Sequence, residues 1–473
     1  MLFNSFEYVI FLPIVFALYW SLRNHRYLQN ILLVIVSYIF YGWWDHRFLL
    51  LIFFTTLCSY ISGVLIDRIK ARKTVMWINI SVNLLLLGYF KYYNFFATEL
   101  QSFFKIAFNF DVDWTLVNVI LPVGISFYTF QALSYTIDVY NKKISATNDF
   151  VSFAAFISFF PQLVAGPIER ATNLLPQFLS PRRFSAENIT DGLRQILWGL
   201  FKKMVIADNC AYIANIVFND YTSGNSSMLL IGAIAFAFQI YGDFSGYSDI
   251  AIGSANLFGI KLNQNFNMPY FSHSIAEFWR RWHISLNTWF IDYVYIPLGG
   301  SKCSKARNVC NVLIVFMLSG LWHGANWTFV IWGLYNGILV CMNKVWEHPL
   351  SYNKSRLLNI ANVIITFSLV LVGWIIFRAD SIGIAFDYIA AIFNNSIFDT
   401  PNFDELGISK IRLFISMLFI PILLMVEWAQ RGRRYEMDIA ISQRFVRWAV
   451  YLVAIFVLFI FSGKQEMFIY FQF

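Results

Sequence analysis

Residues 308–343 read NVCNVLIVFMLSGLWHGANWTFVIWGLYNGILVCMN. They contain no aspartate, glutamate, lysine or arginine, and one histidine, His323. As one straight helix these 36 residues would measure about 54 Å, against roughly 30 Å of bilayer hydrocarbon. We therefore predict two membrane passes or a broken one, with the break between Gly320 and Gly324. An ionisable group at membrane depth is costly, so we expect His323 to face a cavity and to be functional. The alternative is a structural histidine that is hydrogen-bonded inside a helix bundle.

The composition places the whole chain in the same class. Of its 473 residues, 58% are hydrophobic and 13% are charged, and the mean hydropathy is +0.58. Soluble domains carry about twice that share of charged residues. Apolar runs near the length of a bilayer span recur along the chain, whereas the alternating segments of a β-barrel are missing from the pattern. The sequence predicts an all-α polytopic integral membrane protein, with residues 1–473 forming one domain.

Thirteen segments are candidate spans, and three of them (116–134, 150–166 and 192–206) are short or polar enough to be re-entrant. We therefore expect roughly 11 to 13 transmembrane or re-entrant helices. The candidates are 6–21, 28–44, 48–66, 75–96, 116–134, 150–166, 192–206, 228–250, 308–321, 325–343, 358–377, 411–428 and 445–462.

Basic residues predict the orientation of the spans. Arg23 and Arg26 follow the first span, and residues 67–73 after the third are rich in lysine and arginine, whereas the loop at 45–47 is balanced. By the positive-inside rule the odd-numbered loops are cytoplasmic and the N-terminus lies outside. The net charge of +8 is explained by these loops, so no nucleic-acid partner is expected. The five cysteines lack metal-ligand spacing, and we expect neither a metal site nor a disulfide framework.

The most unusual segment outside the spans is 262–300, in which charged residues alternate with tryptophans. Ser274 and Glu277 form an S-x-x-E capping box, so a helix is predicted to begin there and to carry Arg280, Arg281 and His283. This mixture suits the membrane interface or a polar funnel. An ordinary interfacial amphipathic helix is the alternative. The glycines of 297–300 are expected to bring the backbone close to a ligand.

Two further polar islands lie in apolar surroundings. Residues 241–249 read YGDFSGYSD, and the glycines predict an unwound helix that lines a cavity with Asp243 and Asp249. A cation site or structural hydrogen bonding would each account for the two carboxylates. In residues 160–170 two prolines and a glycine are expected to break a helix.

Taken together, four motifs in this order resemble the membrane-bound O-acyltransferase (MBOAT) family. They are QLVAGPI at 162–168, YGDFSGYSD at 241–249, FWRRWHISL at 278–286 and LWHG at 321–324. The likeness is greatest to the bacterial branch of alginate O-acetyltransferases and to the D-alanyl transfer protein of teichoic acid synthesis, and it covers nearly the whole chain. It implies a ring of tilted helices around a cytoplasmic funnel that a central tunnel joins to the outer face.

The resemblance also implies roles for particular residues. His323 matches the catalytic histidine of the family, and His283 matches its second histidine or asparagine. A neutral imidazole can take the proton of an attacking hydroxyl. The expected substrate-binding residues are Trp322 and Asn326, as candidate oxyanion donors, Asp243 in the cavity, and Arg280 and Arg281. The two arginines are expected to meet the phosphates of the donor, or else to pair with Glu277 or with anionic lipid.

We accordingly expect an O-acetyltransferase of the bacterial cytoplasmic (inner) membrane that binds no cofactor. Its donor would be acetyl-CoA or an acyl-carrier thioester, and its acceptor a cell-surface polysaccharide. The resemblance further implies an extracytoplasmic acyl-relay partner with a serine hydrolase-like domain. Two alternatives stay open, namely D-alanyl transfer to teichoic acid on the same scaffold and, more remotely, a transporter or channel in which His323 and the two aspartates line an ion path.

Overall fold

The computed structural model describes residues 1–111, 116, 120–164, 166–345, 355–433, 437 and 443–469. Every regular element in this part of the chain is helical, which confirms the predicted all-α class. Six of the described helices are long and apolar enough to cross a membrane, and they occupy residues 46–68, 72–108, 226–257, 356–378, 410–429 and 444–461. Contacts divide the chain into two compact units, and each is described by itself.

The first unit comprises residues 1–185, 258–262 and 324–326. Its helices begin with Ser5, whose side chain caps the first of them by accepting a hydrogen bond from the Tyr8 amide. The elements are α1 (Phe6–Ser21), α2 (Arg26–Gly42), η1 (His46–Phe48), α3 (Leu49–Arg68), α4 (Arg72–Leu87), η2 (Gly88–Tyr92), α5 (Tyr93–Phe108), α6 (Ile125–Tyr140), α7 (Phe150–Ser158), α8 (Phe160–Leu163) and α9 (Ala171–Leu179).

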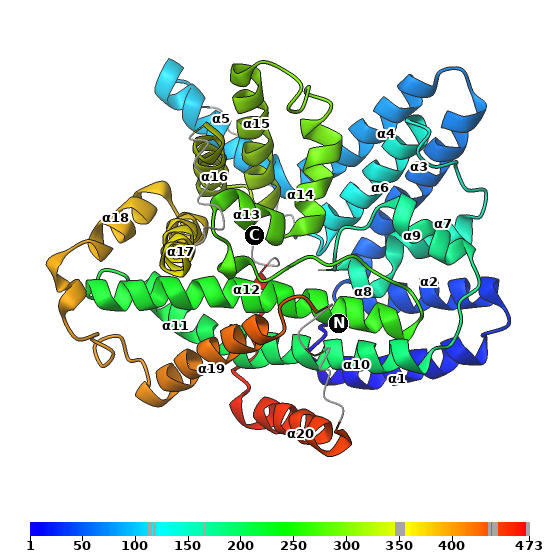
Figure 1. Ribbon diagram of the computed structural model, residues 1–473. Coiled ribbons are helices and arrows are strands. Elements are labelled where there is room, and N and C mark those ends of the chain that lie inside the picture. Colours follow the sequence, from blue (N-terminus) through cyan, green and yellow to red (C-terminus); the bar gives the residue numbers. More distant parts are fainter. Residues whose placement is uncertain are drawn as a thin grey trace. The chain divides into compact units, whose positions relative to one another are not determined.

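The second unit comprises residues 186–257, 263–323 and 327–473. The regular elements among its described residues are helices joined by loops (Figure 1). The elements are α10 (Ala186–Leu200), η3 (Phe201–Ala207), α11 (Asp208–Asn219), α12 (Ser226–Leu257), η4 (Pro269–Phe271), α13 (Ile275–Arg281), α14 (Ile284–Phe290), η5 (Ile291–Tyr295), α15 (Lys305–His323), α16 (Trp327–Val345), α17 (Arg356–Arg378), α18 (Ile382–Ile392), η6 (Asn395–Phe398), α19 (Lys410–Ala429) and α20 (Arg444–Phe461).

Most predicted spans coincide with a helix to within a few residues, but five differ. The segment 75–96 lies in a helical run of α4, η2 and α5 that continues to Phe108, and the segment 228–250 lies in α12, which continues to Leu257. The segment 116–134 falls partly on residues 117–119, which lie outside the described residues, and its helix α6 begins only at Ile125. The segment 150–166 is interrupted at Phe159, between α7 and α8, as the prolines predict. The segment 192–206 belongs to a longer helical run, because α10 continues through the π-helix η3 into α11.

The prediction of an unwound helix at 241–249 is wrong, because α12 is continuous from Ser226 to Leu257. Its glycines serve close packing against the antiparallel run of α10, η3 and α11, which lies alongside α12 in Figure 1. A Cβ atom on Gly246 would lie 2.7 Å from the carbonyl oxygen of Gly199, and one on Gly253 would lie 2.5 Å from that of Gly192. Real Cβ atoms do not approach so closely, so both helices need glycine at these crossings.

The run 308–343 folds as two helices, α15 and α16, as its length predicts. The break lies at residues 324–326, directly after His323, and so begins at Gly324, the last residue of the predicted interval. Gly320 is helical, and a side chain there would collide with the carbonyl group of Phe329 on α16. Gly333 of α16 meets the carbonyl group of Phe316 in the same way. These glycines therefore pack the hairpin, and His323 ends its first helix.

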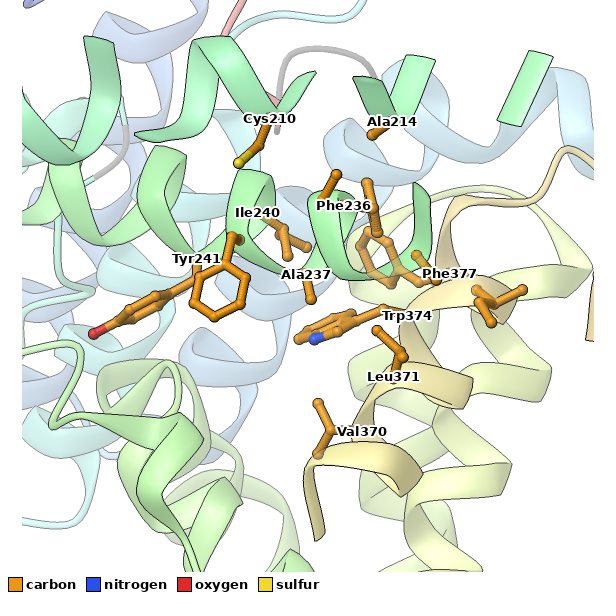
Figure 2. Packing of buried hydrophobic residues seen from close by; sticks show 14 of the residues in the cluster. Cys210, Ala214, Phe236, Ala237, Ile240, Tyr241, Val370, Leu371, Trp374 and Phe377 are labelled. Carbon is orange, nitrogen blue, oxygen red and sulfur yellow. The ribbon is translucent and has the colours of Figure 1, made fainter. Parts of the chain in front are cut away.

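The second unit is built around a large apolar core to which α11, α12 and α17 contribute. Figure 2 shows side chains of these three helices meeting there, with Trp374 of α17 beside Ala237 and Phe236 of α12. Trp374 also contacts Trp282 and Trp332, with ring centroids 4.8 and 6.1 Å away. This aromatic layer extends from the core to the histidine-bearing segments.

Candidate functional site

His323 is the last residue of α15 and is buried in an aromatic shell. Trp332 of α16 and Phe377 of α17 meet its imidazole edge-on, with ring centroids 5.1 and 5.3 Å away, and the neighbouring Trp322 does so at 5.1 Å. Three elements thus fix the position of this one ring. The shell excludes bulk water, which strengthens electrostatic interactions at the imidazole.

His283 occupies the junction of two short helices rather than the body of one. Ser274 caps α13, as predicted, by accepting a hydrogen bond from the Glu277 amide. That helix ends at Arg281, His283 adopts a left-handed conformation (φ 44°, ψ 53°), and α14 begins at Ile284. The predicted helix therefore carries Arg280 and Arg281 but not His283, so the prediction is wrong for the histidine. Burial lowers the pKa of His283 to about 3, so its ring is neutral at physiological pH.

The structure brings the two predicted histidines together through Trp322. The ring of His283 lies 5.8 Å from that of Trp322, which in turn lies 5.1 Å from that of His323. The ring of Phe244 of α12 also packs edge-on against the imidazole of His283, with the two ring centroids 4.6 Å apart. Two imidazoles and an indole, all buried, therefore form a continuous centre, which we call the histidine centre (His283, Trp322 and His323).

The two arginines of the FWRRWH motif have different surroundings. Arg281 pairs with Glu277 at 2.6 Å, whereas Arg280 is exposed and has no ion-pair partner among the described residues. Burial would raise the pKa of Glu277, but hydrogen bonding from the His273 amide at 2.8 Å and the charge of Arg281 outweigh it, and the pKa is lowered. Of the alternatives that the sequence left open for Arg281, the ion pair with Glu277 is the one present.

Asp243, which we predicted as a substrate-binding residue from its place in the 241–249 motif, lies in a buried charge network that sequence reasoning missed. The Lys203 ammonium group binds the carboxylates of Asp208 and Asp243, each at 2.8 Å. The second oxygen of Asp243 accepts a hydrogen bond from the Ile469 amide at 2.7 Å, and Lys203 donates to the Glu466 carbonyl oxygen at 3.1 Å. These bonds tie the segment before the C-terminus to η3 and α12, which indicates a structural task for Asp243.

The same segment reaches the surroundings of the histidine centre. Phe468 packs on Tyr247 at 4.4 Å and on Phe244 at 6.1 Å between ring centroids, and Phe244 is the residue that contacts His283. The sequence signal for this network was weak, because Lys203 and Asp208 lie in a run that reads as a polar span end. The fold brings the ammonium group of Lys203 to Asp243, about 40 positions away, and to the carbonyl oxygen of Glu466, about 260 positions away. Local sequence patterns do not reveal such contacts.

Asp249, the other carboxylate of the YGDFSGYSD motif, pairs with Lys202 and accepts a hydrogen bond from Gln195 at 3.0 Å. The ion pair lines a polar cavity of about 40 Å³. Its walls include Lys202, Ser248, Asp249, Asn265 and Arg433. A cavity beside this motif is therefore present, but it is lined by Asp249 and not by Asp243, and the motif that lines it is helical and not unwound.

Asn326 and the turn at 297–300 were also predicted to lie near a ligand. Asn326 is half-buried in the short connection 324–326, which belongs to the first unit. Gly299 and Gly300 have positive φ angles of 111° and 55°. The side-chain amide nitrogen Nδ2 of Asn311 donates to the carbonyl oxygens of Leu298 and Gly300 at 3.3 Å each. The turn at 297–300 is thus held from α15. Its predicted approach to a ligand stays a prediction.

Comparison with known proteins agrees with the motifs. Residues 141–379 match the family model of MBOAT, the membrane-bound O-acyltransferase family. The chain is 41% identical to a probable alginate O-acetylase, AlgI, of Pseudomonas aeruginosa over 403 residues, covering 83% of this chain and 75% of the relative. It is 34% identical to a peptidoglycan O-acetyltransferase of Helicobacter pylori, covering 81% and 78%.

A more distant relative is a teichoic acid D-alanyltransferase of Bacillus subtilis, which is 31% identical over 279 residues and covers 55% of this chain and 69% of the relative. The family match extends over half of the chain and includes the histidine centre, and the identity to the O-acetylases extends over four fifths. The chain belongs to the membrane-bound O-acyltransferase family and is an acyltransferase.

Proposed function

We propose that the protein transfers an acetyl group from a cytoplasmic thioester to a hydroxyl group on the route to a cell-surface polysaccharide. The hydroxyl oxygen attacks the thioester carbonyl carbon, and the neutral imidazole of His323 takes the hydroxyl proton. When the tetrahedral intermediate collapses, the carbon–sulfur bond breaks and the thiolate leaves, regaining a proton from the imidazolium. The products are an acetyl ester and a free thiol.

The observation that carries this proposal is the histidine centre. The FWRRWH and LWHG motifs, which are separate in the sequence, meet there inside an aromatic shell. Such a shell suits acyl transfer, because it keeps water from hydrolysing the thioester. The indole N–H of Trp322 is our candidate for stabilising the oxyanion. Asn326, the second candidate, stays a sequence-based prediction.

The choice of acetyl over D-alanyl groups follows the relatives. The chain is 34–41% identical to O-acetylases over at least 81% of its length, but 31% identical to the D-alanyltransferase over 55%. The exposed Arg280 is suited to the phosphates of coenzyme A or of a phosphopantetheine arm. We place the enzyme in the bacterial cytoplasmic membrane with its N-terminus outside, and we expect a relay protein with a serine hydrolase-like domain to receive the acetyl group.

The test is to measure ester groups on the cell-surface polysaccharides of the native host. Cells that lack the gene are complemented with the wild type, with His323→Ala or with His46→Ala, an exposed histidine outside the centre. Mild alkali then releases ester-bound acetate and D-alanine for separate quantification. We expect the wild type and His46→Ala to restore acetate, and His323→Ala to leave it at the level of the deletion.

Two outcomes would change the proposal. If D-alanine and not acetate follows the wild-type gene, the enzyme belongs with the teichoic acid D-alanyltransferases. If neither ester depends on the gene, acylation of a surface polymer is the wrong function.

A further inference from the structure

Asn265, in the loop between α12 and α13, makes an unusually complete set of contacts with the segment that carries His283. Its side chain is 1% exposed. The side-chain oxygen Oδ1 lies 3.0 Å from Nδ1 of His283, and it also accepts hydrogen bonds from the Ser285 amide at 3.3 Å and the Ser285 hydroxyl at 2.9 Å. The side-chain nitrogen donates to the hydroxyl oxygen of Ser248 on α12 at 3.3 Å.

These contacts decide which ring nitrogen of His283 carries the proton. A backbone N–H only donates, so the atom facing the Ser285 amide must be the oxygen of the Asn265 amide group. An amide oxygen only accepts, and therefore the neighbouring Nδ1 of His283 must be the donor and must carry a hydrogen. A neutral imidazole has one N–H and one lone pair. The lone pair of His283 is then on Nε2.

Asn265 also holds the backbone on which this ring stands. Its carbonyl oxygen accepts a hydrogen bond from the Ile284 amide at 2.9 Å, and two residues later the Asn267 amide donates to the Arg281 carbonyl oxygen at 2.9 Å. These bonds flank His283 on both sides and fix its left-handed conformation, which costs a non-glycine residue about 1 kcal/mol or more. Ring tautomer and ring position thus depend on the same asparagine.

Among the described residues, the charged and titratable groups near this histidine include side chains of three helices and Arg433, which lines the same cavity as Asn265. His323 of α15 lies on the other side of Trp322. The Lys202–Asp249 pair, from η3 and α12, lines the cavity of which Ser248 and Asn265 are also walls. A charge introduced at position 265 would therefore act on His283 first, because only the Asn265 side chain contacts its Nδ1 in the bonds described above.

We propose that Asn265 is a positioning residue that holds His283 as the Nδ1–H tautomer, so that Nε2 is the atom of this histidine that accepts a hydrogen bond in acyl transfer. The inference rests on the proposed function, since it gives His283 a chemical task in that reaction. The corresponding general rule is that a group bonded to one ring nitrogen sets the protonation of the other. Removal of such an orienting group usually costs roughly 10- to 100-fold in activity.

The first test uses two substitutions of nearly equal size. Asn265→Leu removes the acceptor, and we expect the acetyl-transfer rate in membranes containing the relay partner to fall roughly 10- to 100-fold. Asn265→Asp keeps the acceptor and adds a negative charge that stabilises the imidazolium. Because Nε2 accepts a hydrogen bond only when the ring is neutral, we expect the acid limb of the pH–rate profile to move to higher pH, by about 1–3 units.

The control is the same Asn265→Asp change in a His283→Gln background, where the shift of the acid limb should vanish. A structural role for Asn265 would lower the amount of folded protein but leave the acid limb in place. The inference is overturned if Asn265→Asp leaves the profile unchanged, or if the shift persists without His283.

A second measurement does not depend on activity. Solid-state NMR of protein with ¹⁵N-labelled histidine reads the tautomer directly, and His283→Gln identifies the signal. We expect a protonated Nδ1 and an unprotonated Nε2 in the wild type, and loss of this preference in Asn265→Leu. An Nε2–H tautomer in the wild type would overturn the inference. Absence of acetyl transfer in the wild type, with the tautomer as expected, would instead refute the proposed function.

Discussion

The two histidines of this chain are held by different kinds of contact. His323 is fixed by the edges and faces of three aromatic rings, whereas the ring of His283 donates a hydrogen bond to the side-chain oxygen of one asparagine. Ring contacts restrict position and leave the proton free to move, while a bond to Nδ1 also restricts the tautomer. The first arrangement suits a group that takes and returns a proton, and the second suits a group that presents only Nε2 as an acceptor.

The two neighbouring arginines should respond differently to replacement by glutamine. Arg280→Gln removes an exposed guanidinium, and if this group meets the donor phosphates, KM for the thioester rises by about 10- to 100-fold with kcat unchanged. Arg281→Gln removes the partner of Glu277 and should change stability by no more than about 1 kcal/mol, because the pair is partly exposed. Steady-state kinetics with varied donor separates the two. An unchanged KM in Arg280→Gln would leave the donor phosphates to other residues.

Lys203 is the side chain whose loss should harm the fold most. Lys203→Met leaves the carboxylates of Asp208 and Asp243 buried without their shared cation. Breaking a buried ion pair by removing one partner costs about 3–5 kcal/mol. We expect a lower melting temperature in detergent and faster proteolysis of the segment before the C-terminus. If Lys203→Met melts like the wild type, the network does not hold that segment.

Among the helices, the crossing of α12 with α10 shows why a glycine pattern can mislead. In sequence, the glycines at 242 and 246 look like places where a helix unwinds. In the structure they lie against Lys202 and Gly199 on the antiparallel run, as Gly253 lies against Gly192, so that the two backbones approach closely. Small residues at such spacing are a common device for packing helices in membranes. The pattern carries both meanings, and only the partner helix decides between them.

The crossing gives a test by comparison of two glycines. In Gly246→Ala the new methyl group would lie 2.7 Å from the Gly199 carbonyl oxygen, so overpacking should cost about 1–3 kcal/mol. In Gly88→Ala the methyl group meets nothing within 4 Å, and the change should be neutral or stabilising by up to about 1 kcal/mol. Thermal unfolding in one detergent compares them. Equal melting temperatures would show that the helices can separate without cost.

Local signals in the sequence predicted most helix bounds, the Ser274 cap and the division of 308–343 into two helices. They did not predict the π-helix η3, the left-handed His283 or the ion pairs of Lys202 and Lys203. Each of these depends on contacts with residues tens of positions away, for which local hydropathy and capping patterns carry no information. The pairing of His283 with His323 was implied by family resemblance, and the structure adds Trp322 as the residue between them.

The basic loops predict how the entire chain is oriented in the membrane. If the odd-numbered loops are cytoplasmic, a cysteine at Lys70 should react with an impermeant maleimide only after the membrane is opened. A cysteine at His46 should react in intact cells once the outer membrane is permeable. Both positions are exposed, and the five native cysteines are first replaced by serine. The reverse labelling pattern would place the N-terminus in the cytoplasm and exclude the proposed orientation.

The enzyme as we describe it brings a thioester and a hydroxyl together at a buried imidazole, and the most direct test is the rate of acetyl transfer without that imidazole. Radiolabelled acetyl-CoA is supplied to membranes that contain the wild type, His323→Ala or His46→Ala together with the relay partner. All three proteins are first matched for amount and for gel-filtration behaviour in detergent. We predict that His46→Ala transfers acetyl like the wild type, and that His323→Ala loses about 10²- to 10⁴-fold in rate. Wild-type transfer by a correctly folded His323→Ala protein would contradict the assignment of His323 as the general base.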